Sequence, residues 1–340
     1  MIKRIVLALA LIALCITAYF GYRYFGKNVN SNLTDSYVNI PTGSDFDTVV
    51  KILVEKGIII NEDSFRSLAT RMKYAKPVMR PGRFKVEPSW SNYALIKHLR
   101  AGEQAPVKVI LNYERLVEQI AGKAGKVLES DSLMLLQTFN DQHFLDSIGY
   151  TRDELMSIFL PNTYEMYWNT TPQKFVLRMI SESKAFWDKN GRIEKAKALN
   201  LTPKQVYALA SIVEKESQNI AERPTIAGVY LNRLKINMKL QADPTCVFAS
   251  KDFETKRVTN YHLSVDSPYN TYMYNGLPPG AISIASASSI DAVLNRADHN
   301  YLYFCAKVDA SGTHAFAENL TGHNINVAKY LQMLNEKGIR

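Results

Sequence analysis

The first 25 residues carry a hydrophobic pattern unlike that of the rest of the chain. From Ile5 to Tyr22 there is no charged residue, and about 20 mostly apolar residues suffice for a helix that spans a bilayer. Aromatic residues crowd the far end of this run, as in an interfacial belt. We therefore expect a short cytoplasmic N-terminus at 1–4 and a transmembrane helix at 5–25.

Two processed forms compete with this anchor. A secretory signal peptide needs small residues before its cleavage site, but Ile16 stands two residues before Ala18. Lipoprotein processing at Cys15 is disfavoured because Leu14 before it is large. Basic residues both precede and follow the apolar run, so the charge bias toward an N-terminus inside the cell is weak. The pattern favours an uncleaved, single-pass anchor in the inner (cytoplasmic) membrane, with the chain beyond the polar linker at 26–36 in the periplasm.

After the linker, residues 37–111 combine short alternating stretches with helical stretches that are closed by glycine. This pattern predicts a small α+β module. A strand–helix–helix–strand arrangement of this size often binds glycan or packs on a neighbour. The predicted strands lie at 37–41, 82–87 and 107–111, and the predicted helices at 45–56 and 93–100.

Residues 112–340 predict a second, larger domain of mixed α and β structure. The stretch 114–191 is mainly helical, and Thr202-Pro203 opens another helix, because a threonine cap and a proline in the first turn are typical helix starts. The segment 241–283 is rich in proline and tyrosine, and a long irregular segment in a compact domain is usually functional. Further elements are expected at 172–187 (helix), 286–297 (helix), 301–306 and 314–317 (strands around a turn at 311–312) and 327–337 (helix).

Composition changes this picture little. Hydrophobic residues make up 46% of the 340 residues, which is ordinary for a globular protein. The formal net charge is +9, but no arginine-rich run or nucleic-acid motif localises it, so nucleic acid is not an expected partner. Cys246 and Cys305 lack the close spacing of a metal or redox motif. They are expected to be free thiols, with pairing left open.

One carboxyl group falls on the apolar stripe of the helix that starts at Pro203. At roughly 100° per residue, Glu216 lies within about 50° of the centre of the stripe, and Glu214 lies about 110° away, facing outward. Burial and the negative end of the helix both disfavour a charged carboxyl group and raise the pKa of Glu216. Such a group can protonate a leaving oxygen at neutral pH. The alternative is a helix that ends in a solvated or capping glutamate.

Other catalytic patterns are absent or weak. His-Glu-x-x-His is missing and the six histidines show no tight ligand spacing, so neither a metal nor a cofactor is expected. The segment 122–126 is a poor match to a phosphate-binding loop, since its spacing is wrong and Val127 replaces the needed Ser or Thr. No Gly-x-Ser-x-Gly nucleophile elbow is present.

Several blocks lie along the chain in a characteristic order. The block Ala210-Ser-Ile-Val-Glu-Lys-Glu-Ser217 contains the candidate acid, and the others lie at 229–234, 238–245, 267–272, 276–282, 301–304, 314–316 and 319–324. In order and spacing they resemble the YceG-like (MltG-type) endolytic murein transglycosylases. Each block alone is weak, but together they are specific and cover nearly the whole chain. Asn162, where the family usually has Asp, and the segment 111–115, which lacks the usual Glu-Gly pair, depart from the pattern.

The resemblance implies a YceG-like catalytic domain, a small LysM-like module and Glu216 as the catalytic residue. Glu216 would protonate the oxygen between N-acetylmuramic acid and N-acetylglucosamine, and an oxocarbenium-like state would develop. The 6-hydroxyl of the same muramic sugar would then attack and leave a 1,6-anhydro end. The implied substrates are nascent peptidoglycan glycan strands, and peptidoglycan synthases are candidate partners at the inner membrane.

Residues that can bind sugar cluster in the same blocks. Sugars are bound by planar aromatic faces and amide hydrogen bonds, although packing of the proline-rich loop accounts equally for these side chains. Asp243 either fixes its loop or serves as a second carboxylate. Two other functions compete: a non-catalytic, membrane-anchored glycan-binding scaffold, and a muramidase that uses water. The candidate substrate-binding residues are Ser217, Asn232, Gln241, Asp243, Tyr269, Asn270 and Tyr272.

Overall fold

The computed structural model describes residues 1–308 and 312–336 and divides into two compact units. Unit 1 comprises residues 1–109, 125–130 and 165–171, and unit 2 comprises 110–124, 131–164 and the chain from Pro172 onward. Helices and two-stranded antiparallel sheets make up both units, which confirms the predicted mixture of α and β structure. The predicted turn at 311–312 and the predicted helix end at Lys337 fall partly outside the described residues.

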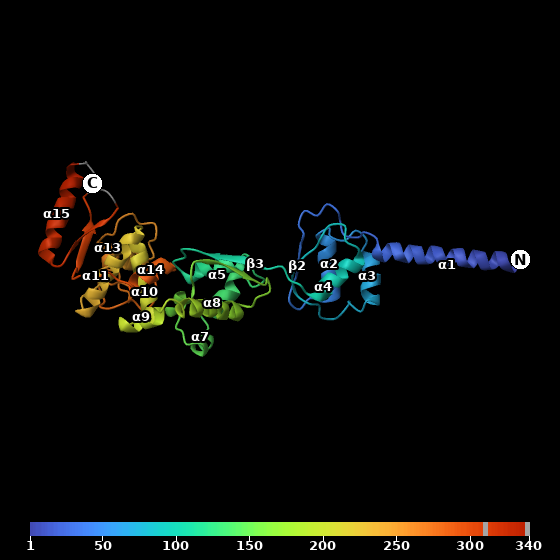
Figure 1. The fold of residues 1–340 in the computed structure, drawn as a ribbon, viewed down its shortest axis with the longest axis horizontal. Helices are drawn as coiled ribbons and strands as arrows, with labels where there is room; N and C mark the ends of the chain where they lie inside the picture. Colours follow the sequence, from blue (N-terminus) through green and yellow to red (C-terminus); the bar gives the residue numbers. More distant parts are fainter. Residues whose placement is uncertain (309–311, 337–340) are drawn as a thin grey trace. The chain divides into compact units, whose positions relative to one another are not determined.

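Unit 1 begins with the apolar helix α1, Ile2–Phe25, at the blue end of the chain in Figure 1. It has 24 residues, its most apolar stretch has a mean hydropathy of 2.3, and none of that stretch is buried. The helix is therefore long and apolar enough to cross a membrane.

The C-terminal end of α1 is fixed to the rest of unit 1 by aromatic side chains. Tyr24 is buried and its hydroxyl lies 3.1 Å from the Ser67 hydroxyl. The Arg71 guanidinium lies 5.4 Å from the centre of the Phe20 ring. Two of the aromatic residues expected to form an interfacial belt thus pack on protein instead.

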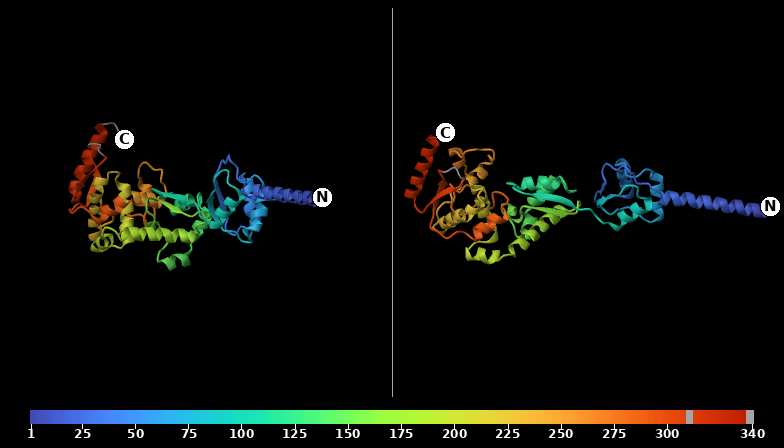
Figure 2. Two further views of the ribbon diagram at one scale, coloured as in Figure 1. Left: turned by 45° about the vertical axis from the view of Figure 1, so that its right-hand side comes forward. Right: turned by 45° about the horizontal axis from the view of Figure 1, so that its top comes forward.

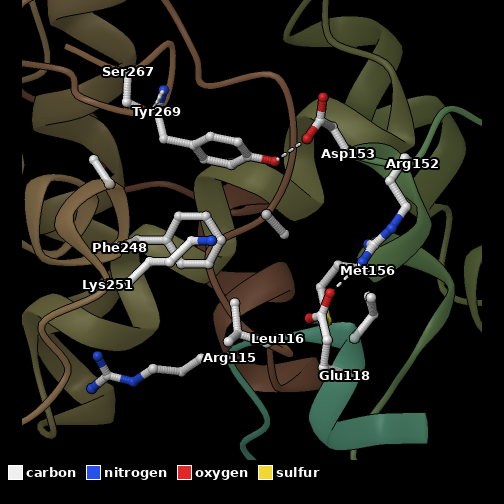
Figure 3. Close-up of a pocket in the computed structure, with 13 residues that line it drawn as sticks. Arg115, Leu116, Glu118, Arg152, Asp153, Met156, Phe248, Lys251, Ser267 and Tyr269 are labelled. Atoms are coloured by element: carbon white, nitrogen blue, oxygen red, sulfur yellow. Dashed lines mark hydrogen bonds and ion pairs between the residues drawn. The ribbon is translucent and has the colours of Figure 1, made fainter. Parts of the chain in front are cut away.

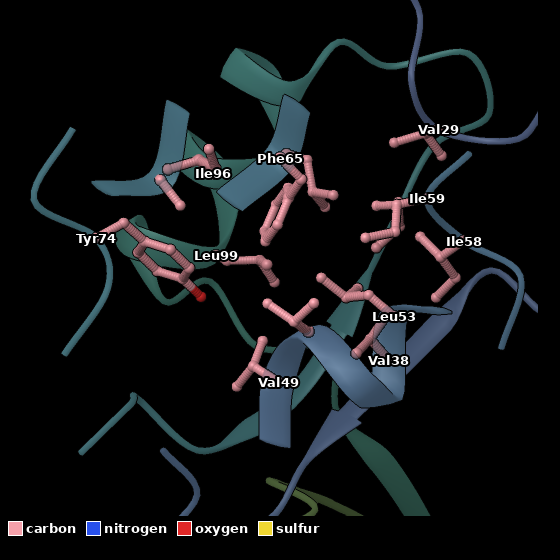
Figure 4. Packing of buried hydrophobic residues seen from close by; sticks show 14 of the residues in the cluster. Val29, Val38, Val49, Leu53, Ile58, Ile59, Phe65, Tyr74, Ile96 and Leu99 are labelled. Carbon is pink, nitrogen blue, oxygen red and sulfur yellow. The ribbon is translucent and has the colours of Figure 1, made fainter. Parts of the chain in front are cut away.

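The small module of unit 1 pairs β1, Tyr37–Ile40, antiparallel with β2, Gly82–Lys85. Its helices are α2, Phe46–Glu55, α3, Glu62–Arg71, and α4, Asn92–Ala101. Apolar side chains from all of these elements turn toward one another in a single core (Figure 4).

The first residues of the predicted linker belong to this core. Val29 is 1% exposed, and the Asn28 amide donates to Oδ1 of Asn92 at 2.7 Å. The backbone of Asn28 also bonds to that of Trp90 and Ile60. Residues 27–30 are therefore built into the module rather than crossing solvent.

A second two-stranded sheet is formed by β3, Val107–Leu111, and β4, Asn162–Met166. The strand β4 lies in a stretch that was predicted to be helical, and that prediction is wrong for these five residues. The helical elements between residues 112 and 187 are α5, Val117–Gly125, α6, Ser132–Phe139, α7, Gln142–Ile148, η1, Glu154–Ile158, and α8, Pro172–Trp187.

Unit 2 is organised around α10, Pro203–Glu216, which packs against helices on several sides. The helix opens with a capping box, in which the side chains of Thr202 and Gln205 each accept from the backbone amide of the other. From Val206 to Glu214 every residue is buried. The helices around it are α9, Arg192–Ala198, α11, Arg223–Lys235, α12, Asp243–Ser250, and α14, Ala287–Leu294.

The C-terminal part of unit 2 is a hairpin and a helix. Strands β5, Tyr303–Ala306, and β6, His314–Ala317, pair antiparallel as predicted, and α15, Leu320–Glu336, lies beside them (Figure 2). This helix begins earlier than the predicted range of 327–337. The segment 241–283 contains α12 and the short α13, Asn260–Leu263, and is otherwise irregular.

Candidate active site

A small cavity with a volume of about 250 Å³ lies at the C-terminus of α10 and is called here the Glu216 cavity. Glu216 is the last residue of α10 and is partly buried. The walls come from α10, α11, the start of α12, the loop after α13 and the β5–β6 hairpin, so segments distant in sequence meet at one carboxyl group. The lining residues are Glu216, Tyr230, Arg233, Leu240, Gln241, Asp243, Tyr272, Phe304, Cys305, Ala306 and His314.

The surroundings of Glu216 favour its protonated form. Burial raises the pKa of Glu216 from its ordinary value of 4.5 to about 7, and the nearby negative charge of Asp243 acts in the same direction. A hydrogen bond from Tyr230 and the positive charge of Arg233 act against this rise. Burial is the cause that the helical pattern predicted. The group is therefore poised to give up or take a proton near neutral pH.

Tyr230 and Arg233, both on α11, hold the inner side of the cavity. The Tyr230 hydroxyl donates to Oε1 of Glu216 at 2.5 Å. Burial and the adjacent Glu216 raise the pKa of Tyr230 well above its usual value, so its hydroxyl stays a neutral donor. The Arg233 guanidinium donates to the carbonyls of Leu302 and Leu240, each at 2.6 Å, and so joins the cavity wall to the residue directly before β5. The helical pattern of α10 alone could not single out either residue.

Three of the predicted substrate-binding residues line this cavity. The Tyr272 hydroxyl donates to Oδ1 of Asp243 at 2.6 Å, which orients the carboxylate. Gln241 is exposed and has a φ of 48°, in the left-handed region that non-glycine residues seldom adopt. Its backbone amide donates to the carbonyl of Thr271 at 3.1 Å, which fixes the loop in this conformation.

Three other predicted residues serve the fold around the cavity rather than lining it. Ser217 is buried, and its hydroxyl donates to Glu222 at 3.3 Å. The Asn232 amide donates to the carbonyls of His299 and Tyr301. The fully buried Asn270 donates to the carbonyls of the loop at 263–265. The two asparagine amides are thus used by backbone carbonyls and the Ser217 hydroxyl by Glu222, since a buried polar group needs such partners.

Tyr269 lines a different cavity of unit 2, called here the Tyr269 cavity, with a volume of about 530 Å³ (Figure 3). Its hydroxyl donates to Oδ1 of Asp153 at 2.9 Å. The two neighbouring tyrosines of the sequence block 267–272 therefore face two separate spaces.

His314 closes the outer side of the Glu216 cavity from β6. Its backbone amide and Nδ1 lie 2.7 and 2.8 Å from the two carboxylate oxygens of Glu222. Glu222 in turn accepts from Ser217, directly after the candidate acid. This chain of contacts ties the hairpin to the end of α10. His314 is not among the predicted site residues, and its place beside the cavity is created only by the fold.

Glu214 does not face outward, so that prediction is wrong. It is 7% exposed, 3.2 Å from the Arg223 guanidinium, and it accepts from the hydroxyls of Ser286 and Ser289. Burial would raise the pKa of Glu214, but these two hydrogen bonds and the charge of Arg223 outweigh it, and the pKa is lowered. The reason for the error is that α14 and the residues before it cover this face of α10, which a single-helix projection cannot reveal.

Neither metal clusters nor disulfides are found within residues 1–308 and 312–336. No group of three or more His, Cys, Asp or Glu side chains there is placed to hold a metal ion. Cys246 and Cys305 are free thiols, as expected. Burial raises the pKa of Cys246 to about 11, so this thiol is not ionised at neutral pH.

The fold and the site together define a mixed α and β protein with one protonatable glutamate at a cavity of polar and aromatic side chains. The chain belongs to the YceG-like family, whose model matches residues 38–329.

Named relatives agree with this family. A Bacillus subtilis protein named endolytic murein transglycosylase is 27% identical over 93% of this chain and 92% of its own length. A Streptococcus pneumoniae protein of the same name is 28% identical over 92% of this chain, which spans 62% of that relative. The crystal structure of a yceG-like protein from Listeria monocytogenes is similar with a TM-score of 0.56 and 27% identity, over 85% of this chain and 97% of that one.

Proposed function

We propose that this chain is an endolytic peptidoglycan lytic transglycosylase in which Glu216 acts first as general acid and then as base. The observation that carries the proposal is the position of Glu216: partly buried at the end of α10, in a cavity, with a pKa raised to about 7. The names of the Bacillus and Streptococcus relatives supply the substrate class.

In the proposed reaction, protonated Glu216 gives its proton to the oxygen that joins N-acetylmuramic acid to N-acetylglucosamine. The bond from C1 of the muramic sugar to that oxygen breaks, and positive charge develops on the sugar ring. The 6-hydroxyl oxygen of the same sugar then bonds to C1, and its proton passes to Glu216. No atom is gained from water, and the enzyme regains its starting protonation state.

Asp243 has a supporting role in this proposal. It is the other carboxylate that lines the Glu216 cavity, and its hydrogen bond from Tyr272 keeps it oriented. Its negative charge raises the pKa of Glu216 and would stabilise the developing positive charge of the sugar. A water-using muramidase would instead need this carboxylate to activate water.

The raised pKa of Glu216 favours an enzyme over a glycan-binding scaffold. Burial of a carboxyl group costs free energy of folding. A protein that only binds glycan gains nothing in return, whereas a catalytic acid needs the raised pKa that burial produces. The cavity also places Tyr230 and Arg233 against this one group.

We further propose that α1 anchors the enzyme in the cytoplasmic membrane with both units in the periplasm. The small module, 37–111, would bind or place the glycan in the manner of a LysM domain, and the order β1–α2–α3–β2 in its first part supports this role. Peptidoglycan synthases are proposed partners, because nascent strands emerge at the same membrane.

The mass of the products tests the proposed function. Purified glycan strands digested with the full-length protein in detergent should yield 1,6-anhydro ends, which are one water lighter than reducing ends. Reducing ends would identify a muramidase, and uncut strands would favour the scaffold.

A further inference from the structure

The Tyr269 cavity shares two walls with the Glu216 cavity. The helix α12 starts at Asp243 beside Glu216 and carries Phe248 into the Tyr269 cavity. Five residues of helix span only about 7.5 Å. The loop after α13 likewise presents Tyr272 to one cavity and Tyr269 to the other. The two cavities are therefore neighbours along α12.

Two positive charges of the Tyr269 cavity have no carboxylate partner among the described residues. Figure 3 shows Arg152 paired with Glu118, at 2.6 Å, and Tyr269 reaching Asp153. Arg115 and Lys251 come from the other side of the cavity and take part in neither pair. They are the groups left to meet a negatively charged ligand.

The field of Arg115 extends from this cavity to the catalytic helix. Burial lowers the pKa of Lys215, and the positive charge of Arg115 lowers it further. Lys215 directly precedes Glu216 in α10. The guanidinium itself lies 5.0 Å from the centre of the Phe253 ring, a cation–π contact that does not neutralise its charge as a carboxylate would.

The cavity also has an apolar floor. The rings of Phe248 and Tyr269 lie 4.7 Å apart at an angle of 47°, and Leu116 and Met156 line the same space. Three cations stand against two carboxylates in its lining. This modest excess of positive charge suits a single carboxylate better than a doubly charged phosphate, which Glu118 and Asp153 would repel.

We infer that the Tyr269 cavity is a second substrate site, in which Arg115 and Lys251 bind a carboxylate of a peptide stem attached to the glycan strand. The inference rests on the proposed function, because it takes murein as the substrate. It adds a preference: strands that carry stems with free carboxylates bind and are cut better than strands whose stems are uncharged.

Two substrates and two double variants test this site. The substrates are stem-bearing glycan strands and the same strands after amidation of their carboxylates, which keeps the stem and removes its charge. The test variant is Arg115→Gln with Lys251→Gln. The matched control is Lys189→Gln with Lys197→Gln, which removes two exposed charges that line neither cavity. Binding is measured in full-length protein that also carries Glu216→Gln, so that strands stay intact.

The protein with both cations should bind the carboxylate strands about tenfold more tightly than the amidated strands, since partly exposed ion pairs typically contribute up to about fivefold each. The control pair should keep this preference and the test pair should lose it. Two results would overturn the inference. One is equal affinity of the protein with both cations for carboxylate and amidated strands, and the other is an unchanged preference for carboxylate strands in the variant with Arg115→Gln and Lys251→Gln. Because binding is read without cutting, a failure of the proposed chemistry leaves this result interpretable.

Discussion

The Tyr230 hydroxyl donates to Oε1 of Glu216 at 2.5 Å across the interface of α11 and α10. The bond favours the charged carboxylate, while burial favours the protonated acid. These are the two largest effects on the pKa of about 7, and the charges of Asp243 and Arg233 add smaller ones. Tyr230 thus sets both the orientation and the acidity of the proposed catalyst.

Tyr230→Phe should move the pH profile of strand cutting. Loss of the hydrogen bond raises the pKa of Glu216, so the fall in kcat/KM on the alkaline side should shift upward by about one pH unit. Tyr150→Phe removes a hydroxyl that lines neither cavity and should leave the profile in place. A profile that is unchanged in Tyr230→Phe would show that the contact has no role in acidity.

Glu216→Gln should make stability less dependent on pH. The folded pKa of about 7 lies above the ordinary value of 4.5, so the stabilising effect of protonated Glu216 is fully present below pH 4.5 and is lost as the pH rises to 7. Relative to the wild type, the variant should gain stability over this window, by up to about 3 kcal/mol, and the gain should level off above it. Thermal unfolding across pH 4 to 8 measures the difference, and a gain that falls with pH would contradict the burial of Glu216.

Glu214→Gln should destabilise unit 2, which reverses the sequence-based expectation for this residue. It leaves the buried Arg223 without its counter-charge, a change that typically costs about 3 kcal/mol. Glu194→Gln, at an exposed position on α9, is the matched control and should change little. Denaturant unfolding compares the two variants, and equal stability would mean that the ion pair contributes nothing.

The membrane proposal has its own test. A reporter fused after Arg340 that is active only in the periplasm should give signal, and the purified protein should retain residues 5–22. Its N-terminal sequence decides between an anchor and a cleaved signal, because a chain beginning near Ala18 has lost the helix.

The sequence predicted elements whose signals are local. The threonine cap and first-turn proline of α10, the limits of α8 and the strands of the β5–β6 hairpin follow from neighbouring residues. The strand β4 was missed because its five residues are ordered by pairing with β3, which is distant in the chain. Glu214 was misplaced for a similar reason, since α14 covers it from another part of the sequence.

The candidate site divides in the same way. The position of Glu216 on the apolar side of its helix follows from helical pitch, and the family resemblance adds Gln241, Asp243 and Tyr272, which line the cavity. Asn232 and Asn270 have side chains as suitable for sugar, but the backbone carbonyls that they satisfy are created only by the fold. Tyr230 could have been found from the sequence. It lies within the block 229–234, on the helix that follows the one with the candidate acid, and its hydroxyl can donate to a carboxylate.

The most direct test of the central claim is the count of 1,6-anhydro ends released from purified glycan strands by Glu216→Gln. The amide keeps the size of the side chain but cannot donate the proton, and general acid–base help is worth about 10²–10⁴-fold. The variant should remain folded, because the side chain keeps its size. Because the same group acts twice in the reaction, the variant should release almost no anhydro ends under conditions in which the wild type releases them. Normal release of anhydro ends by folded Glu216→Gln would contradict the assignment of Glu216 as the catalytic acid.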